Sequence, residues 1–256
     1  KVNRNLILHL AKMIISYTVL FLKRPIIFTR FLSLEKMDGV PIFSRWKNLF
    51  INCHILKEKL DWLHFGFATI AIKRENVARA IGARMGVSLR GYDICIYPLK
   101  QPKCYQRLWE KVDKVQSISN DLLVAAQKQD LTDDTPQITI HPAIDIDIFN
   151  TRGKNWKKFN GKEKIRFLTI ARLHWKKGLE YTLEALTVLK ENNILFQYTV
   201  IGEGREHERL ILAANQMGLD NLVNFAGSVP HQEIRGYYKE ADIYLQYSIQ
   251  EGFCNA

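Results

Sequence analysis

The sequence is poor in the features that mark secreted, zinc-binding and repeat proteins. It has four cysteines in 256 residues, with no Cys-x-x-Cys pair and no histidine partner at zinc-ligand spacing. These absences exclude a cysteine-based zinc site, and they favour free thiols in a reducing, cytoplasmic compartment. The chain also shows no internal repeat and no low-complexity tract.

Long hydrophobic runs are missing as well. The longest uncharged run near the N-terminus, residues 13–22, is too short to cross a bilayer, and residues 21–25 do not resemble a signal-peptide cleavage site. Lys12, Lys23 and Arg24 flank this run. We expect a helix that either packs on its own domain, which is the more common case, or rests on anionic lipid as a basic amphipathic segment.

What the chain has in excess is positive charge. Its formal net charge is +11, while its 47% hydrophobic and 25% charged residues are ordinary for a soluble globular protein of one large or two modest domains. Such a surface attracts polyanions, which include nucleic acid, anionic lipid and phosphate-bearing substrates. Basic and aromatic residues interleave at Trp156 to Phe159, but no nucleic-acid-binding motif is present, so we expect no nucleic-acid partner.

Strands and helices alternate over the C-terminal part of the chain. Strands are predicted over residues 165–171, 194–201, 222–225 and 243–247, and helices over 178–189, 206–217 and 230–241. This alternation is typical of βαβ units with a parallel sheet, in which ligands bind at the carboxyl ends of the strands. Polar and glycine residues follow each predicted strand and should meet at one edge: Arg172, Gly202, Gly204, Gly227, Ser248 and Glu251.

The N-terminal part follows a similar but weaker pattern. Strands are predicted over residues 62–65, 86–89, 114–118 and 137–141, and helices over 68–85 and 120–129, the second capped by Ser119 or Asn120. The polar, glycine-containing stretch 151–163 reads as a linker between domains at 1–150 and 164–256. The predicted fold is α/β, with two Rossmann-like domains whose parallel sheets face a cleft.

Arg172 and Lys177, which follow the first C-terminal strand, can bind phosphate. Arg172 ends that strand and Lys177 begins the next helix, where two cations and the positive end of a helix suit a diphosphate. Gly202 and Gly204 form a Gly-x-Gly turn that can admit a nucleotide. Each motif has a plain structural alternative, because a basic loop can be merely solvated and a glycine turn merely tight.

The last motif begins at Glu251. If a helix starts there, its free N–H groups would face the same edge as Arg172, and the carboxylate could hold sugar hydroxyls. The structural alternative is a capping carboxylate. The residues that follow Glu251 are Gly252, Phe253 and Cys254.

Several short motifs follow one another in a fixed order over residues 164–256. They are Ala171-Arg172-Leu173, Lys177-Gly178-Leu179, Val200 to Gly204, Val223 to Val229, Ala241 to Tyr244, and Ser248 with Glu251-Gly252-Phe253. Together they resemble the C-terminal domain of family 4 glycosyltransferases, also called group 1, which have the GT-B fold.

The resemblance implies roles for these residues. Arg172 and Lys177 would neutralise the departing diphosphate, and Glu251 would be the first glutamate of a paired motif near the donor sugar. The nucleotide and sugar would be lined by Gly202, Gly204, Gly227, Ser228, Val229, Ser248, Gly252, Phe253 and Cys254. The second glutamate would lie beyond Ala256, so we expect the chain to be a fragment that lacks both ends.

The N-terminal part also resembles a family 4 acceptor domain, of the bacterial polysaccharide kind. The resemblance rests on Leu63 to Ala68, Ser88 to Ile94, Ser117 to Leu122 and His141 to Asp145. Relatives often carry His-Gly where this chain has Arg90-Gly91. The candidate acceptor-side residues are His64, Arg90 and Asp93, although His64 could instead be a half-buried histidine, and Arg90 and Asp93 an internal ion pair. Asp145 is expected to have a structural role.

Residues and resemblance together predict a glycosyltransferase. It would move a sugar from a nucleotide-diphosphate donor to a glycan or lipid-linked acceptor in bacterial cell-surface polysaccharide biosynthesis, such as that of lipopolysaccharide. The resemblance implies retention of configuration, no metal and no cofactor, and a cytoplasmic protein that is peripheral on the inner face of the plasma membrane. The alternatives are a GT-B nucleotide-sugar epimerase and a basic protein that binds membranes or nucleic acid.

Overall fold

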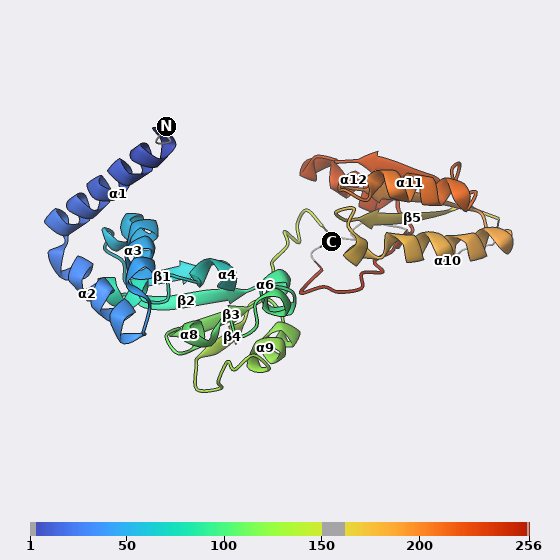
Figure 1. Cartoon of the computed structure of the whole chain (residues 1–256). Helices are drawn as coiled ribbons and strands as arrows, with labels where there is room; N and C mark the ends of the chain where they lie inside the picture. Colours follow the sequence, from blue (N-terminus) through green and yellow to red (C-terminus); the bar gives the residue numbers. More distant parts are fainter. Residues whose placement is uncertain (1–3, 150–161, 255) are drawn as a thin grey trace. The chain divides into compact units, whose positions relative to one another are not determined.

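The computed structural model describes residues 4–149, 162–254 and 256, with side chains from residue 8 onward. The chain divides into two compact units, Lys1–Pro142 and Ala143–Ala256. Each unit is built on a four-stranded sheet with helices (Figure 1). The linker predicted over 151–163 lies, apart from residues 162 and 163, outside the described residues.

Unit 1 begins with three helices and continues as an α/β unit. Its elements are α1 (Arg4–Lys23), α2 (Pro25–Met37), α3 (Ile42–Leu56), β1 (Trp62–Phe65), α4 (Ala68–Ala71), α5 (Val77–Ile81), β2 (Arg84–Leu89), α6 (Gly91–Cys95), α7 (Tyr97–Lys100), α8 (Gln106–Trp109), β3 (Lys114–Ser117), α9 (Asn120–Gln127) and β4 (Gln137–Thr139). The strands are parallel in the order β1-β2-β3-β4. The four predicted strands are confirmed with small shifts of their ends, and Ser119 caps α9 by accepting a hydrogen bond from the Leu122 N–H.

One N-terminal prediction is wrong in detail. The helix expected over residues 68–85 is two short helices, α4 and α5, followed by the start of β2 at Arg84. Gly82 ends α5 in the left-handed region, with φ +81°, so the chain turns into the strand two residues earlier than predicted.

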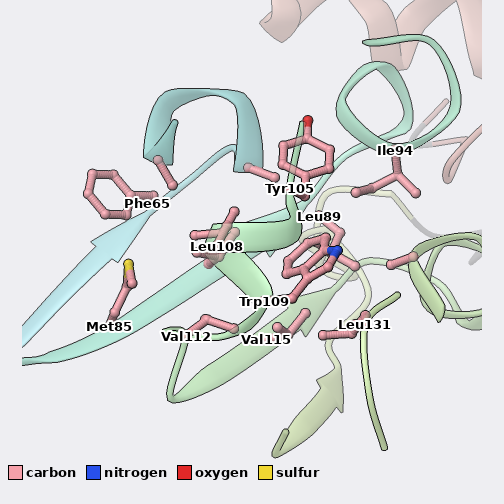
Figure 2. Close-up of a cluster of buried hydrophobic side chains, with 14 of the residues drawn as sticks. Phe65, Met85, Leu89, Ile94, Tyr105, Leu108, Trp109, Val112, Val115 and Leu131 are labelled. Atoms are coloured by element: carbon pink, nitrogen blue, oxygen red, sulfur yellow. The ribbon is translucent and has the colours of Figure 1, made fainter. Parts of the chain in front are cut away.

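The core of unit 1 lies on one face of the sheet, where alternate residues of β2 and β3 point into it. Leu89 and Val115 are fully buried there, under Tyr105, Leu108 and Trp109. Figure 2 shows these aromatic and aliphatic side chains gathered over the strands. The polar ends of the aromatic residues are satisfied, because Tyr105 donates to the Asp93 carbonyl at 2.9 Å and Trp109 Nε1 donates to the Gln129 carbonyl at 2.8 Å.

The N-terminal helices of unit 1 form a second, smaller core. Phe31 of α2, Leu49 and Leu56 of α3 and Val77 of α5 are fully buried in it. Helix α1 packs on this core along one side, through buried Leu20, which confirms that the segment packs on its own domain. Among the described residues, no helix combines the length and the apolar character that a membrane span requires.

Unit 2 has the alternating pattern that the sequence predicts. Its elements are β5 (Ile165–Ile170), the 3-10 helix η1 (Trp175–Lys177), α10 (Leu179–Glu191), β6 (Phe196–Ile201), α11 (His207–Gln216), β7 (Val223–Gly227), α12 (His231–Glu240) and β8 (Ile243–Tyr244). All pairings are parallel, in the order β7-β6-β5-β8. Both faces of this sheet are covered, because Phe167 packs in the cluster with α10 and α11 while Leu168 packs with Ala241 and Tyr237.

Strand β8 is shorter than predicted. It pairs with β5 at Ile243 and Tyr244, and one further hydrogen bond joins the Leu245 N–H to the Leu168 carbonyl. Beyond that point the backbone leaves the sheet and bonds to the loop before α10, with the Ile249 N–H donating to the Lys176 carbonyl at 2.8 Å. Tertiary contacts with that loop therefore replace the continued strand.

Candidate functional site

The loops after the strands of unit 2 are joined to one another at the carboxyl edge of the sheet. The Ala171 N–H donates to the Ile201 carbonyl at 3.0 Å, and the Leu173 N–H donates to the Glu203 carbonyl at 2.9 Å. The Gly202 N–H donates to the Gly227 carbonyl at 2.7 Å. The predicted convergence of these loops is confirmed, and it follows from the parallel direction of the strands.

Three glycines allow these loops to approach this closely. A Cβ on Gly202, whose φ is +134°, would lie 1.9 Å from the Ala171 carbonyl oxygen. A Cβ on Gly204 would lie 2.2 Å from the Leu173 oxygen, and one on Gly178 would lie 2.0 Å from the Tyr247 oxygen. The glycines are thus required by the close packing of the loop backbones.

Lys177 and Glu251 form an ion pair at this edge, although they lie far apart in the sequence. The Glu251 Oε1 accepts from the Lys177 ammonium, from Ser248 Oγ at 2.7 Å and from Gln246 Nε2 at 3.3 Å. The two charged side chains are 21% and 26% exposed, so the pair is partly shielded from water and its attraction exceeds that of an open surface pair. The structure therefore brings together Lys177, Ser248 and Glu251.

Sequence reasoning missed two residues of this cluster. Gln246 lies beside Ser248 and Glu251, and the ring of Tyr247 lies against the backbone of Gly178 and 5.9 Å from the ring of Tyr181. Gln246 lay inside the strand predicted over residues 243–247, so no sequence signal placed it in this cluster. The same holds for Tyr247, because the shortening of β8 decides the positions of both residues.

Arg172 is exposed and carries an uncompensated charge. Within the part of the chain that the structure describes, its guanidinium makes no hydrogen bond and no ion pair. It lies close enough to His174 to influence it, since burial first, and then the charges of Arg205, Lys176 and Arg172, lower the pKa of that imidazole. A cation that is near the glycine loops and has no anionic partner there is available to a ligand.

His174 shapes the loop that carries these cations. Its Nδ1 accepts from the Lys176 N–H at 3.3 Å, and its Nε2 lies 3.0 Å from an Arg205 guanidinium nitrogen. Both neighbours are donors, and a neutral imidazole accepts at only one nitrogen, so one of the two contacts is formed at a time. The lowered pKa agrees with this geometry, because a protonated ring could accept neither.

The remaining predicted donor-side residues lie along the same loops. Ser228 and Cys254 are exposed, Val229 packs under the sheet with Ile201, and Phe253 is 38% exposed. Residues 251–254 show no helical turn. The helix considered from Glu251 is therefore not seen in residues 251–254.

In unit 1, His64 belongs to a polar chain that crosses one face of the sheet. Its Nε2 lies 2.8 Å from Ser88 Oγ, Ser88 donates to the Gln116 side-chain oxygen, and Gln116 Nε2 donates to the Ile140 carbonyl at 3.2 Å. Because the Ser88 proton goes to Gln116, Nε2 is the protonated nitrogen of His64. The ring is exposed and bonds to a side chain, so it is not the half-buried histidine that the alternative describes.

Asp93 is not placed as predicted. Its side chain is fully buried inside unit 1, where Oδ1 accepts from Thr69 Oγ1 at 2.7 Å. Its predicted exposure to an acceptor is therefore wrong, because the start of α6 points the carboxylate inward. Among the described residues it forms no ion pair with Arg90, which is half-buried at the N-cap of α6. Asp145 has the structural role expected of it, since its Oδ1 accepts from the Asp147 and Ile148 N–H groups.

Because Asp93 is buried, we expect the stability of the protein to depend on pH. Burial raises the pKa of Asp93, and contacts with Thr69 and with the backbone of Ala68 and Arg90 oppose the rise without cancelling it. Because the pKa of Asp93 is higher in the folded than in the unfolded protein, its contribution to the free energy of unfolding is fully present below the unfolded pKa. That contribution is lost as the pH rises through the folded pKa.

We therefore expect the free energy of unfolding of the wild type, relative to Asp93→Asn, to fall as the pH rises from about 4 towards 7. Urea unfolding of both proteins across this range measures the difference. Asp113→Asn, at an acidic residue with no such burial, serves as the control. A difference that stays flat with pH would contradict the assignment.

Comparison with known proteins identifies the C-terminal region. Residues 152–256 match the family described as glycosyl transferases group 1. The chain is 39% identical over 95 residues to the amylovoran biosynthesis glycosyltransferase AmsK of Erwinia amylovora, covering 35% of this chain and 23% of that protein. It is 26% identical over 190 residues to WcaL of Escherichia coli (strain K12), a glycosyltransferase assigned to colanic acid biosynthesis, covering 73% of this chain and 45% of WcaL. The chain thus spans less than half the length of either relative.

Solved structures share the fold at low sequence identity. The Anabaena protein HepE, solved in complex with UDP, superposes with a TM-score of 0.61 at 14% identity, over 76% of this chain and 55% of that one. The galactosyltransferase WaaB of the lipopolysaccharide outer core gives 0.56 at 16% identity, over 82% of this chain and 54% of that one. The predicted α/β fold of the GT-B class is confirmed.

Proposed function

The chain carries a domain of the glycosyl transferases group 1 family, and from this premise we propose that it is a family 4 glycosyltransferase of bacterial cell-surface polysaccharide biosynthesis. It transfers a sugar from a nucleoside diphosphate to a hydroxyl of a glycan or lipid-linked acceptor. The observation that carries the proposal is the Lys177–Glu251 ion pair at the edge where the glycine loops meet, on a loop that also carries Arg172, whose guanidinium has no partner among the described residues. The similarity to AmsK and WcaL, both named for polysaccharide biosynthesis, supports the assignment to that kind of pathway.

In this proposal the two cations stabilise the leaving group. When the bond between the sugar and the diphosphate breaks, negative charge grows on the phosphate oxygens, and Arg172 and Lys177 meet it in a partly shielded site. Lys177 exchanges its contact with Glu251 for one with the diphosphate, which leaves the Glu251 carboxylate free to accept from sugar hydroxyls. Fixed cations supply the charge that a metal supplies elsewhere, so we propose transfer without metal or other cofactor. We also propose that the configuration is retained, which is what the family resemblance implies.

The glycine loops hold the nucleotide. The space beside Gly227 is open, since a Cβ there would meet nothing within 4 Å, and we assign the base and ribose to this space, next to the turn of Gly202 and Gly204. Exposed Ser228 borders this space at the end of β7, Val229 packs beneath it with Ile201, and Ser248, Gly252, Phe253 and Cys254 border the sugar. The complex of HepE with UDP, on the same fold, makes a uridine nucleotide the first donor to test.

The acceptor is assigned to unit 1, through His64 and Arg90. His64 is exposed and oriented by Ser88, so its unprotonated Nδ1 can accept from a hydroxyl. Buried Asp93 acts indirectly, by fixing Thr69 to the start of α6. We place the reaction at the cytoplasmic face of the plasma membrane, where a lipid-linked acceptor is presented.

Nucleotide binding tests the proposal directly. We expect one of UDP, GDP or ADP, or one of their sugars, to raise the melting temperature. A ligand at about 100 times its Kd stabilises the native state by about 2.7 kcal/mol. Lys177→Ala should lose the shift, and Lys176→Ala, which removes a neighbouring cation, should keep it. A chain that none of these nucleotides stabilises would contradict the proposal, and release of a free sugar epimer without acceptor would replace it with an epimerase.

A further inference from the structure

His174 is placed to hold the turn that carries Lys177. It is the residue before η1, where its backbone is extended and its Nδ1 accepts from the Lys176 N–H at 3.3 Å. Its own carbonyl oxygen accepts from the Lys177 N–H at 2.8 Å. The side chain and the carbonyl of one residue therefore both close the turn that ends at Lys177, so a change at this ring is transmitted to Lys177.

The rest of the turn is fixed by backbone contacts. The Lys176 carbonyl accepts from the Ile249 N–H at 2.8 Å, and Gly178 lies against the carbonyl oxygen of Tyr247. Peptide groups do not change charge with pH, whereas imidazole is the side chain that ordinarily does so near neutral pH. The cap from His174 therefore responds to pH in a way that these backbone contacts do not.

Arg205, on the loop after β6, competes for the same ring. A nitrogen of its guanidinium lies 3.0 Å from Nε2 of His174. A neutral imidazole accepts at one nitrogen, so it either caps η1 through Nδ1 or binds Arg205 through Nε2. The Arg205 side chain is 69% exposed, so water can replace the ring there, and this favours the cap. A protonated ring carries a hydrogen on both nitrogens, faces a donor on each side, and loses both contacts.

The charges around His174 oppose its protonation. Burial is the largest cause that lowers the pKa of His174, and three cations add to it: Arg205, Lys176 and Arg172. Glu206 acts in the other direction, but its carboxylate is already paired with Arg205 at 3.6 Å. A positive charge on the imidazole would therefore add to three cations that two adjoining loops already carry.

We propose that the neutral imidazole of His174 is a positioning residue for Lys177, and that its protonation opens the turn and weakens donor binding. In the neutral state, the cap keeps η1 closed and holds the Lys177 ammonium where the diphosphate is bound. In the protonated state, the cap is lost and the imidazolium repels the cations of the two loops. This inference rests on the proposed transfer reaction and names a pH control of its diphosphate site.

The sign of the pH dependence follows from the direction of the shift. Because the pKa of His174 is lower in the folded than in the unfolded protein, the cap is present above the ordinary histidine pKa of about 6.5 and is lost as the pH falls through the folded pKa. Arg205→Met should raise the pKa of His174, because one of the charges that oppose protonation is removed.

Nitrogen NMR of the full ¹⁵N-labelled chain tests the pH control without any nucleotide. The ring signals of His174 are identified by their absence in His174→Asn. We expect an unprotonated Nδ1 at about pH 8, and a Lys176 amide signal that shifts as His174 titrates below about pH 6.5. In His174→Asn the Lys176 amide should not titrate, because an asparagine side chain caps the turn at every pH.

Calorimetry with UDP tests the consequence for the site. Relative to His174→Asn, the wild type should lose affinity about five- to tenfold between about pH 8 and pH 5, the factor that loss of an N-cap contact typically produces. Protonation of UDP is common to both proteins and cancels in the ratio. At pH 8, His174→Ala should bind more weakly than His174→Asn. His231→Asn, at an exposed histidine on α12, is the control and should follow the wild type.

Three results would overturn the proposal. They are a Lys176 amide that does not follow the His174 titration, a ratio of UDP affinities that stays constant with pH, and a wild type that binds UDP more tightly in acid relative to His174→Asn. The last result would mean that the imidazolium attracts the diphosphate. Unchanged melting temperatures at pH 8 show that the variants fold. If UDP does not bind at pH 8, the uridine assignment fails, and the NMR titration still decides the pH control.

Discussion

Replacing Lys177 with alanine is expected to lower kcat/KM for sugar transfer by about 100- to 1000-fold, the loss typical when one preorganised group that stabilises developing charge is removed. The Lys177 ammonium lies at the meeting point of the loops after β5, β6 and β8, held there by Glu251. Arg172→Ala should give a loss of similar size. The two losses should not add fully, because both cations act on one diphosphate.

The control for this prediction is Lys176→Ala. Lys176 has the same charge and the same loop, but its ammonium lies over the Trp175 ring, 5.8 Å from the ring centroid, and not at Glu251. It should keep activity within about threefold of the wild type. Initial rates with saturating and limiting donor separate kcat from KM. If Lys177→Ala retained wild-type turnover, the assignment of the diphosphate site would be wrong.

The stability of Lys177→Ala should change little, which makes the kinetic loss interpretable. The pair it breaks is partly exposed, and such pairs contribute about 1 kcal/mol or less. Glu251 keeps its contact with Ser248 in the variant. A melting temperature near that of the wild type is expected, and a large drop would instead assign Lys177 a mainly structural role.

Gly202→Ala is expected to destabilise unit 2 by about 3 kcal/mol or more, which lowers its melting temperature by roughly 10 °C or more. The added methyl group would lie 1.9 Å from the Ala171 carbonyl oxygen, and that oxygen belongs to a backbone held by the Ala171 bond to Ile201. The φ of +134° adds strain for any residue with a Cβ. Relief requires the loops after β5 and β6 to separate.

Gly236→Ala provides the matched comparison in the same unit. Gly236 lies within α12, and a Cβ there would have no neighbour within 4 Å. Alanine lowers the entropy of the unfolded chain and favours the helix, so this variant should gain about 0.5–1 kcal/mol. Thermal unfolding followed by circular dichroism measures both changes. Equal effects of the two substitutions would show that close backbone packing is not what requires Gly202.

Much of unit 2 could be read from local patterns. Leucines at helical spacing in α10, apolar runs in β5 and β6, and Gly218 after α11 depend on near neighbours in the chain, so the sequence predicts these elements and their order. Once the strands are parallel, their carboxyl ends must share one edge. For this reason the convergence of Arg172, Gly202 and Gly227 was predictable.

Contacts between residues distant in sequence were not predictable in the same way. The length of β8 depends on the loop before α10, and Asp93 is buried because Thr69 and the core residues around Tyr105 surround the start of α6. A carboxylate near a predicted strand end looks exposed in the sequence, where nothing shows which side chains will cover it.

By itself, the sequence determined the two α/β units, the direction of their strands, the edge at which the site forms and the family resemblance. These follow from hydrophobic periodicity and from glycines at the ends of helices and strands, which depend only on near neighbours in the chain. The tertiary structure alone decided that Glu251 accepts from Lys177 and Ser248, and that Arg172 has no partner among the described residues. These outcomes depend on which surfaces meet when distant segments pack. Burial and pairing are properties of the packed chain, and local sequence does not fix them.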